Sequence, residues 1–149
     1  EVILHHIIPS LEKKKFRFRV IICGALPEKR FLQLNAIPNI TATGFVESIQ
    51  DYMQSADAFI NPVLNGSGIQ TKNIEVIANG CNVVATAFAA SGLPDYLINE
   101  KVFVSADNEW EHFTDNIIAA SSMHTAVPQQ FYNDHNWQNI VDSLLKQVL

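Results

Sequence analysis

The chain has 149 residues, of which 48% are apolar and 17% charged, and its formal net charge is −5. This length and balance are typical of one globular domain that buries a core of its own. An acidic chain lacks the excess of lysine and arginine that holds a phosphate backbone, so the composition argues against general nucleic-acid binding.

The first segment is expected to be a helix that ends in basic residues. Apolar positions recur through residues 2–14, and Pro9 marks a point where the helix starts or kinks. A solvated helix end explains the cations that follow, because cations suit a helix C-terminus. Contact with a membrane surface is the alternative for this cluster, which comprises Lys13, Lys14, Lys15, Arg17 and Arg19.

Strand-like and helix-like segments alternate along the rest of the chain. Strands are predicted at 18–23, 40–44, 58–63, 83–85 and 102–104, and helices at 28–34, 46–55, 71–79, 110–120 and 137–148. Short apolar strands that alternate with helices indicate an α/β fold with a mainly parallel sheet and helices on both faces. We therefore expect a three-layer, Rossmann-like domain.

Open parallel sheets bind ligands outside the carboxyl ends of their strands. In this chain those positions carry Gly24, Gly44, the glycines Gly66 and Gly68, and residues 86–92. We expect these four loops to converge on one crevice. A plain turn that needs positive φ is the alternative for each glycine taken alone.

The most informative loop is the turn at residues 65–75, which leads from a predicted strand directly into a predicted helix. The unpaired amides and the dipole of a helix N-terminus favour a phosphate, and Lys72 adds a full positive charge. Glu75 lies about one turn deeper, where its carboxylate can accept hydrogen bonds from hydroxyl groups. A nucleoside diphosphate with its ribose fits this layout, although neither G-x-G-x-x-G nor the P-loop motif is present.

Plainer roles exist for both charged residues. Lys72 is also explained as an exposed lysine on a helix, since most surface charges are solvated. Glu75 is also explained as a first-turn glutamate that complements the helix dipole.

The run from Gly66 to Thr86 resembles the donor-nucleotide half of GT-B glycosyltransferases, most closely glycosyltransferase family 4. The likeness extends upstream to residues 20–27, 43–46 and 53–62. The positions that carry it in the run are Gly66, Ser67, Gly68, Ile69, Thr71, Lys72, Glu75, Ala78, Gly80, Val83, Val84, Ala85 and Thr86. The turn at 91–94 is similar to the family loop beside the phosphates, and a plain turn explains it nearly as well.

This resemblance implies transfer of a sugar from a UDP- or GDP-linked donor to an unknown acceptor, with retention as the family's expectation. Lys72 would stabilise the leaving diphosphate and Glu75 would bind the ribose, so both are candidate catalytic residues. It further implies a role in polysaccharide or glycoconjugate biosynthesis. The implied donor-binding residues are Gly24, Gly44, Phe45, Val46, Asn65, Gly66, Ser67, Gly68, Ile69, Thr71, Lys72 and Glu75.

One position departs from the family pattern. The family places a glutamate where this chain has Asn65, and the turn here is two residues longer. An amide can bind a sugar hydroxyl but supplies no negative charge near an oxocarbenium ion, so donor sugar and stereochemistry stay open. Two alternatives also stay open: a non-catalytic nucleotide-binding or partner-docking module of this fold, and a GT-B sugar-nucleotide epimerase.

The resemblance also bears on partners and location. Nothing ahead of Val2 matches the strand and basic turn that open this half in the resembled enzymes. We expect that strand and the N-terminal acceptor-binding domain to lie outside residues 1–149, which alone would be inactive. The protein is expected in the cytoplasm, with the inner face of a membrane as a further possibility.

Neither the cysteines nor the histidines have metal-ligand spacing, so we expect no metal and no cofactor. Cys23 and Cys81 lie in apolar runs and are expected to be buried thiols in a reducing compartment. The histidines are expected at the surface or in packing contacts; they are His5, His6, His112, His124 and His135.

Overall fold

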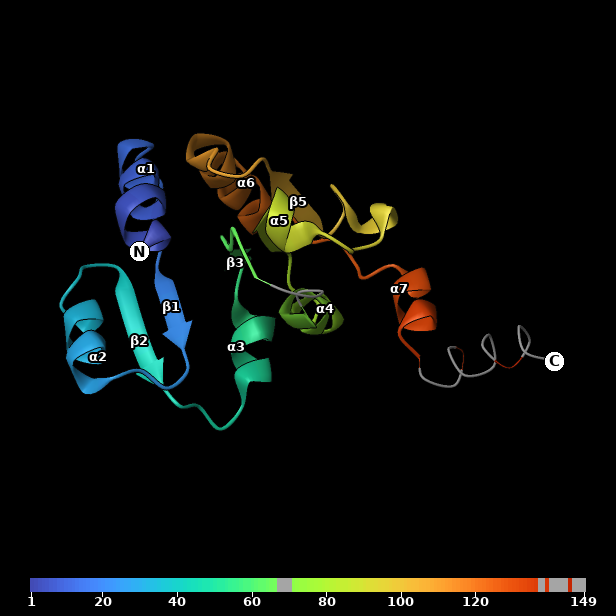
Figure 1. The fold of residues 1–149 in the computed structure, drawn as a ribbon, viewed down its shortest axis with the longest axis horizontal. Coiled ribbons are helices and arrows are strands. Elements are labelled where there is room, and N and C mark those ends of the chain that lie inside the picture. Colours follow the sequence, from blue (N-terminus) through green and yellow to red (C-terminus); the bar gives the residue numbers. More distant parts are fainter. Residues whose placement is uncertain (67–70, 137–138, 140–144, 146–149) are drawn as a thin grey trace.

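The computed structural model describes residues 1–66, 71–136, 139 and 145 (Figure 1). The strands are β1 (Val20–Cys23), β2 (Ile40–Gly44), β3 (Phe59–Asn61), β4 (Val83–Thr86) and β5 (Val102–Ser105). The helices are η1 (Ile3–Ile7), α1 (Ile8–Lys13), α2 (Glu28–Asn35), α3 (Ile49–Ser55), α4 (Thr71–Ala78), α5 (Ala87–Ala90), η2 (Asp95–Leu97), α6 (Trp110–Ser122) and α7 (Gln129–Asp134).

All strand pairing is parallel, which confirms the α/β class. The strands form two sheets, β1-β2 and β3-β4-β5, where a single sheet was expected. Val20 lies opposite Ile40 in the first sheet, and β4 is the central strand of the second. Among the described residues, no pairing joins β1 to β3, and the strands therefore fall into two sheets.

The three-stranded sheet has helices on both faces because its side chains alternate between them. In β4, Val84 belongs to a cluster with Phe113 and Ile117 of α6. Its neighbours Val83 and Ala85 belong to a different cluster, with Val76 and Ile77 of α4. All four side chains of β4, including that of Thr86, are fully buried, as expected of the middle strand of a three-layer fold.

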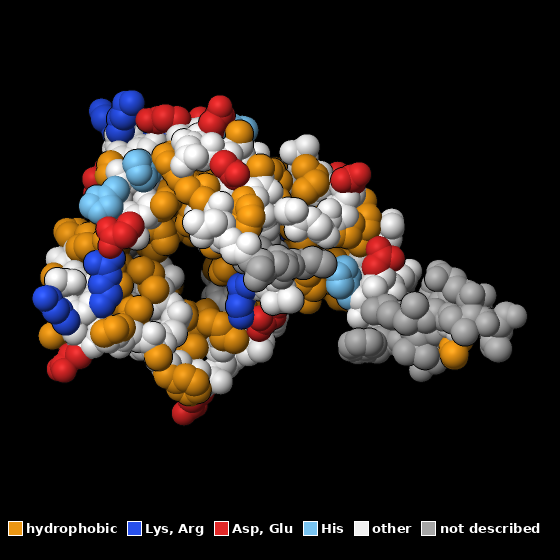
Figure 2. Space-filling model, viewed as in Figure 1, with side chains coloured by type: hydrophobic (Ala, Val, Ile, Leu, Met, Phe, Trp, Pro, Cys, Tyr) orange, Lys and Arg blue, Asp and Glu red, His pale blue; other side chains and the backbone are white. Residues whose placement is uncertain are grey.

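The two-stranded sheet is covered less completely. Its core joins Ile40 and Ala42 of β2 to Leu34 of α2 and Ile8 of α1. Ile21 of β1 points away from this core and is 49% exposed. Figure 2 shows a hollow between the part built on β1 and β2 and the part that carries α3 and α4.

The N-terminal helix forms as expected and changes type just before Pro9. Residues Ile3–Ile7 are a π-helix, and α1 begins at Ile8 with Pro9 in its first turn. Proline has no backbone N–H to donate, so the helical hydrogen-bond pattern is interrupted where the π-helix gives way to α1.

The basic cluster begins where α1 meets α6. Lys14 Nζ lies 2.6 Å from Asp115 and 3.4 Å from Glu111, and Lys13 Nζ also lies 3.4 Å from Glu111. The hydrogen bond to Asp115 raises the pKa of Lys14. Within the described part of the chain, no helix combines the length and apolar character needed to cross a bilayer.

Three short helices were not predicted. The four-residue α5 begins where Thr86 Oγ1 accepts a hydrogen bond from the amide of Ala89. The other two, η2 and α7, each follow a proline. The helix predicted at 137–148 lies outside the described residues, apart from Asn139 and Leu145.

Candidate functional site

The first turn of α4 has one buried and one exposed side. Asn73, Val76 and Ile77 are fully buried, whereas Lys72 points outward with half of its side chain exposed. This separation follows from helical spacing, because residues three and four apart share a face. Lys72 and Glu75 are three residues apart and therefore lie together on the accessible side.

Lys72 and Glu75 form an ion pair with 2.6 Å between Nζ and Oε2. Their side chains are 51% and 37% exposed, so the pair is open to solvent. Exposed pairs of this kind contribute about 0–1 kcal/mol. An incoming anion can therefore displace Glu75 from the ammonium at small cost and leave the carboxylate available as an acceptor.

The glycine turn ahead of α4 is described only at its ends. Asn65 and Gly66 are both exposed, and Gly66 has φ +150°, a conformation that residues with side chains rarely adopt. Thr71 is exposed and opens the helix. The predicted contacts at Ser67, Gly68 and Ile69 lie outside the described residues.

A second group of predicted residues lies at the carboxyl ends of β1 and β2. Gly24 and Gly44 both have positive φ, and the Gly24 amide donates to the Gly44 carbonyl at 2.8 Å. The next side chain, Phe45, is 85% exposed, and Val46 is half-buried. The turns after two neighbouring strands are thus tied together, with an uncovered aromatic ring beside them.

The structure therefore brings the predicted residues together in two groups. Lys72 and Glu75 are in contact in one, and Gly24 and Gly44 in the other. Among the described residues, no hydrogen bond or ion pair links the two groups. The first lies on α4, which packs against the three-stranded sheet, and the second follows the strands of the two-stranded sheet. The single crevice expected from the sequence stays a prediction.

Sequence reasoning missed the polar residues that support α4. Asn61 Nδ2 donates to Asn73 Oδ1 at 2.9 Å, and Asn73 Nδ2 donates to the Ala89 carbonyl at 2.8 Å. The hydroxyl of Thr86 donates to the Val63 carbonyl. The signal was an asparagine on the otherwise apolar, inward face of the helix at 71–79.

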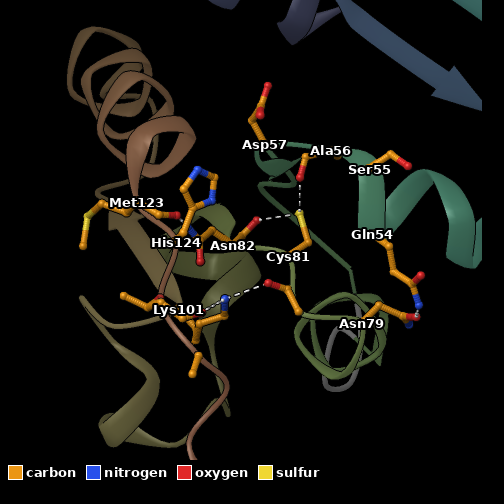
Figure 3. A pocket seen from close by; sticks show the side chains of 13 residues that line it. Gln54, Ser55, Ala56, Asp57, Asn79, Cys81, Asn82, Lys101, Met123 and His124 are labelled. Atoms are coloured by element: carbon orange, nitrogen blue, oxygen red, sulfur yellow. Dashed lines mark hydrogen bonds between the residues drawn. The ribbon is translucent and has the colours of Figure 1, made fainter.

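A cavity of about 550 Å³ lies away from these groups, at the amino ends of β3, β4 and β5 (Figure 3). Lys101, 1% exposed, lies beside it and donates to the carbonyls of Gly80 and Thr125 at 2.8 and 2.9 Å. Burial lowers the pKa of Lys101. Both bonds join backbone segments, so this lysine serves the fold.

The two cysteines differ. Cys81 lines the cavity, is 4% exposed, and has its pKa raised by burial. Cys23 is only half-buried, which corrects the expectation that both thiols are buried. The reason is its place at the end of β1, in the less completely covered sheet.

The same cavity is lined by a third buried asparagine, Asn82. Its amide nitrogen donates to the carbonyls of Ala120 and Met123 at 2.9 and 2.7 Å, which secures the end of α6.

Within the described ranges, no three His, Cys, Asp or Glu residues are grouped so that they could hold a metal ion.

The comparison with protein families agrees with the fold. A family model described as glycosyl transferases group 1 matches residues 1–122. The chain therefore belongs to the glycosyl transferases group 1 family, which confirms the resemblance seen in the sequence and supports glycosyl transfer as its general function. No curated protein matches the chain.

Proposed function

We propose that this chain binds the nucleotide of a nucleotide diphosphate sugar at the start of α4, and that the protein transfers the sugar to an acceptor. The observation that carries this proposal is the accessible Lys72–Glu75 pair on the first turns of a helix that follows β3. Carboxyl ends of parallel strands are where open α/β sheets bind ligands.

Lys72 acts on the diphosphate. Negative charge grows on the leaving group as the glycosidic bond breaks, and a fixed ammonium stabilises that charge without a metal ion. The amides of Gly66, Ser67 and Gly68 and the helix dipole add to this stabilisation. Because Lys72 is held by an exposed partner, the phosphate replaces Glu75 as its counter-ion.

Glu75, once released, accepts hydrogen bonds from the ribose hydroxyls. Asn65 stands at the exposed beginning of the same turn and offers an amide to the sugar. Being neutral, it cannot support positive charge at the anomeric carbon. Retention of configuration remains the family expectation, and the sugar itself is not specified.

The base of the nucleotide is proposed to lie near Gly24, Gly44, Phe45 and Val46. An aromatic ring that is 85% exposed offers a face on which a base can stack. The joined turns of Gly24 and Gly44 offer backbone groups to its edge. UDP and GDP donors both satisfy these requirements.

The acceptor is proposed to bind to a separate N-terminal domain of the longer protein, in the cytoplasm or at the inner face of a membrane. A further strand between β1 and β3 is part of this proposal. The division of the strands into two sheets and the hollow in Figure 2 support it.

Titration of the full-length protein with UDP, GDP, ADP and CDP tests the site. Lys72→Ala should reduce diphosphate affinity about tenfold or more, since a charged hydrogen bond is worth about 1.5–3 kcal/mol. Glu75→Ala should reduce discrimination between ribose and deoxyribose nucleotides. Lys29→Ala and Glu12→Ala, which change exposed residues elsewhere, are the matched controls. Parent-like binding by both site variants would refute the assignment.

Mass spectrometry of a nucleotide sugar incubated with the full-length protein and a simple acceptor tests the reaction. Transfer predicts free nucleoside diphosphate and a glycoside. An isomeric nucleotide sugar would indicate the epimerase instead, and an unchanged donor would indicate a non-catalytic binding module.

A further inference from the structure

The first turn of α4 is held by hydrogen bonds to two other elements. Asn73, fully buried, accepts from Asn61 at the end of β3 and donates to the Ala89 carbonyl in α5. Asn61 is 6% exposed, so water has little access to this chain of hydrogen bonds. The amide of Asn73 is thus a bridge between the ends of β3 and β4.

The bridge belongs to a larger network at the carboxyl ends of three strands. Thr86, fully buried, joins the Val63 carbonyl beyond β3 to the amide of Ala89. The amide of Phe88 donates to Asp107, beyond β5, at 3.0 Å. Loops after β3, β4 and β5 are therefore connected through polar contacts at the edge that carries Lys72.

Core filling alone does not explain two asparagines at this place. Burying an amide costs free energy unless its hydrogen bonds are made, and leucine has nearly the same shape. The deeper inward positions of α4 are in fact apolar, Val76 and Ile77. What hydrogen bonds add over apolar contacts is direction, because they weaken steeply when their angles change.

Direction matters at this turn more than elsewhere in the helix. The first amides of a helix have no partner within it, so its first turn frays unless other groups hold it. Asn73 follows Lys72 directly and precedes Glu75 by two residues. Fixing the backbone at residue 73 fixes where both charged side chains begin.

We infer that Asn61 and Asn73 are positioning residues for the proposed donor site: their hydrogen bonds hold the first turn of α4 so that Lys72 meets the diphosphate and Glu75 the ribose. This inference rests on the proposed function. It predicts that the pair affects nucleotide affinity through Lys72, beyond any effect on stability.

The test is a cycle of variants in the full-length protein, with UDP and GDP as probes. Asn73→Leu should weaken nucleotide affinity about tenfold in the parent, which is the effect expected when one charged hydrogen bond to the ligand is removed. In a Lys72→Ala background the same substitution should weaken it by a smaller factor, because the ammonium that Asn73 orients is already absent. Equal factors in the two backgrounds would overturn the inference.

Asn82→Leu is the matched control. Asn82 is likewise buried and joins two segments, through donation of its amide nitrogen to the Ala120 and Met123 carbonyls, but it lies at the amino end of β4, beside the cavity in Figure 3. Asn82→Leu should lower the free energy of unfolding measured in urea. It should leave nucleotide affinity within about twofold of the parent, because distant sites are usually independent to about that extent. If Asn73→Leu does not fold, Asn61→Leu removes the same hydrogen bond from the β3 side and takes its place in the cycle, where equal factors in the parent and Lys72→Ala backgrounds would again overturn the inference.

Hydrogen exchange at α4 separates this inference from the proposed function. Asn73→Leu should speed exchange of the hydrogen-bonded amides of α4, which begin at Glu75, and Asn82→Leu should not. A parent that binds neither UDP nor GDP contradicts the proposed function and overturns the inference with it. If the parent binds UDP or GDP and Asn73→Leu binds it equally well, the inference is overturned but the proposed function is not.

Discussion

The two ends of the three-stranded sheet use the same residue types differently. At the carboxyl ends, Lys72 is half exposed and paired with a carboxylate. At the amino ends, Lys101 is buried and bonded to two backbone carbonyls. A lysine whose donors already meet the backbone has little left for a ligand, whereas one held by a displaceable carboxylate can exchange its partner. The cavity of about 550 Å³ therefore lies at the end less suited to binding an anion.

The largest effect is expected from Lys101→Met, which tests whether the lysine at the amino ends of the sheet serves stability alone. The substitution leaves the Gly80 and Thr125 carbonyls without their donor and also removes the cost of burying a charge. Hydrogen bonds to charged groups are worth about 1.5–3 kcal/mol each, so we expect the free energy of unfolding to fall by about 2 kcal/mol. Urea unfolding measures it. Nucleotide affinity should stay at the parent value, and a large reduction would show that the two ends are not independent.

Measuring the free energy of unfolding of Lys101 and Lys101→Met proteins over a range of pH tests the role of Lys101 further. Burial lowers the pKa of Lys101 below its ordinary value of 10.5. Between the lowered pKa and 10.5 the unfolded chain holds the extra proton, so the contribution of Lys101 to the free energy of unfolding rises with pH. Below that window both states are protonated, and the cost of burying the charge is fully present.

Cys81 and Lys101 shift each other's pKa, so the Lys101→Met comparison is made in a Cys81→Ala background, where the difference in unfolding free energy isolates the contribution of Lys101. Burial raises the pKa of that thiol, and its effect on stability has the opposite sign, falling as pH rises above 9. A parent-minus-variant difference that shrinks as pH approaches 10.5 would contradict the assignment to Lys101.

The smallest expected effect is that of a chelator. If Lys72 and the start of α4 neutralise the diphosphate, EDTA should leave the affinity for UDP or GDP unchanged. Calorimetric titration with and without EDTA, with added magnesium as the converse control, measures this. A large drop in affinity on chelation would mean that carboxylates and a cation hold the phosphates instead.

Much of the fold could be predicted because its strands are buried, β-branched runs. The prediction of 40–44 has the bounds of β2, and that of 83–85 is one residue shorter than β4. By contrast, α5 was missed because its four residues depend on the cap supplied by Thr86. The division into two sheets was missed because strand pairing depends on contacts far apart in sequence.

For the candidate site, too, the sequence is informative only where local spacing decides the arrangement. Helical spacing explains why Lys72 and Glu75 lie together on one accessible side of α4. The roles assigned to them stay predictions. The bridge from Asn61 through Asn73 to Ala89 could not be predicted, because it requires β3, α4 and α5 to be placed relative to one another.

The divided sheet also has a consequence for the behaviour of this chain in solution. β1 and β3 each pair on one side only in the part of the chain that the structure describes. Uncovered strand edges are templates for pairing with another molecule, and the exposed side chains of Ile21 and Phe45 lie at or next to this incomplete sheet. We expect residues 1–149 by themselves to associate through these edges as their concentration rises.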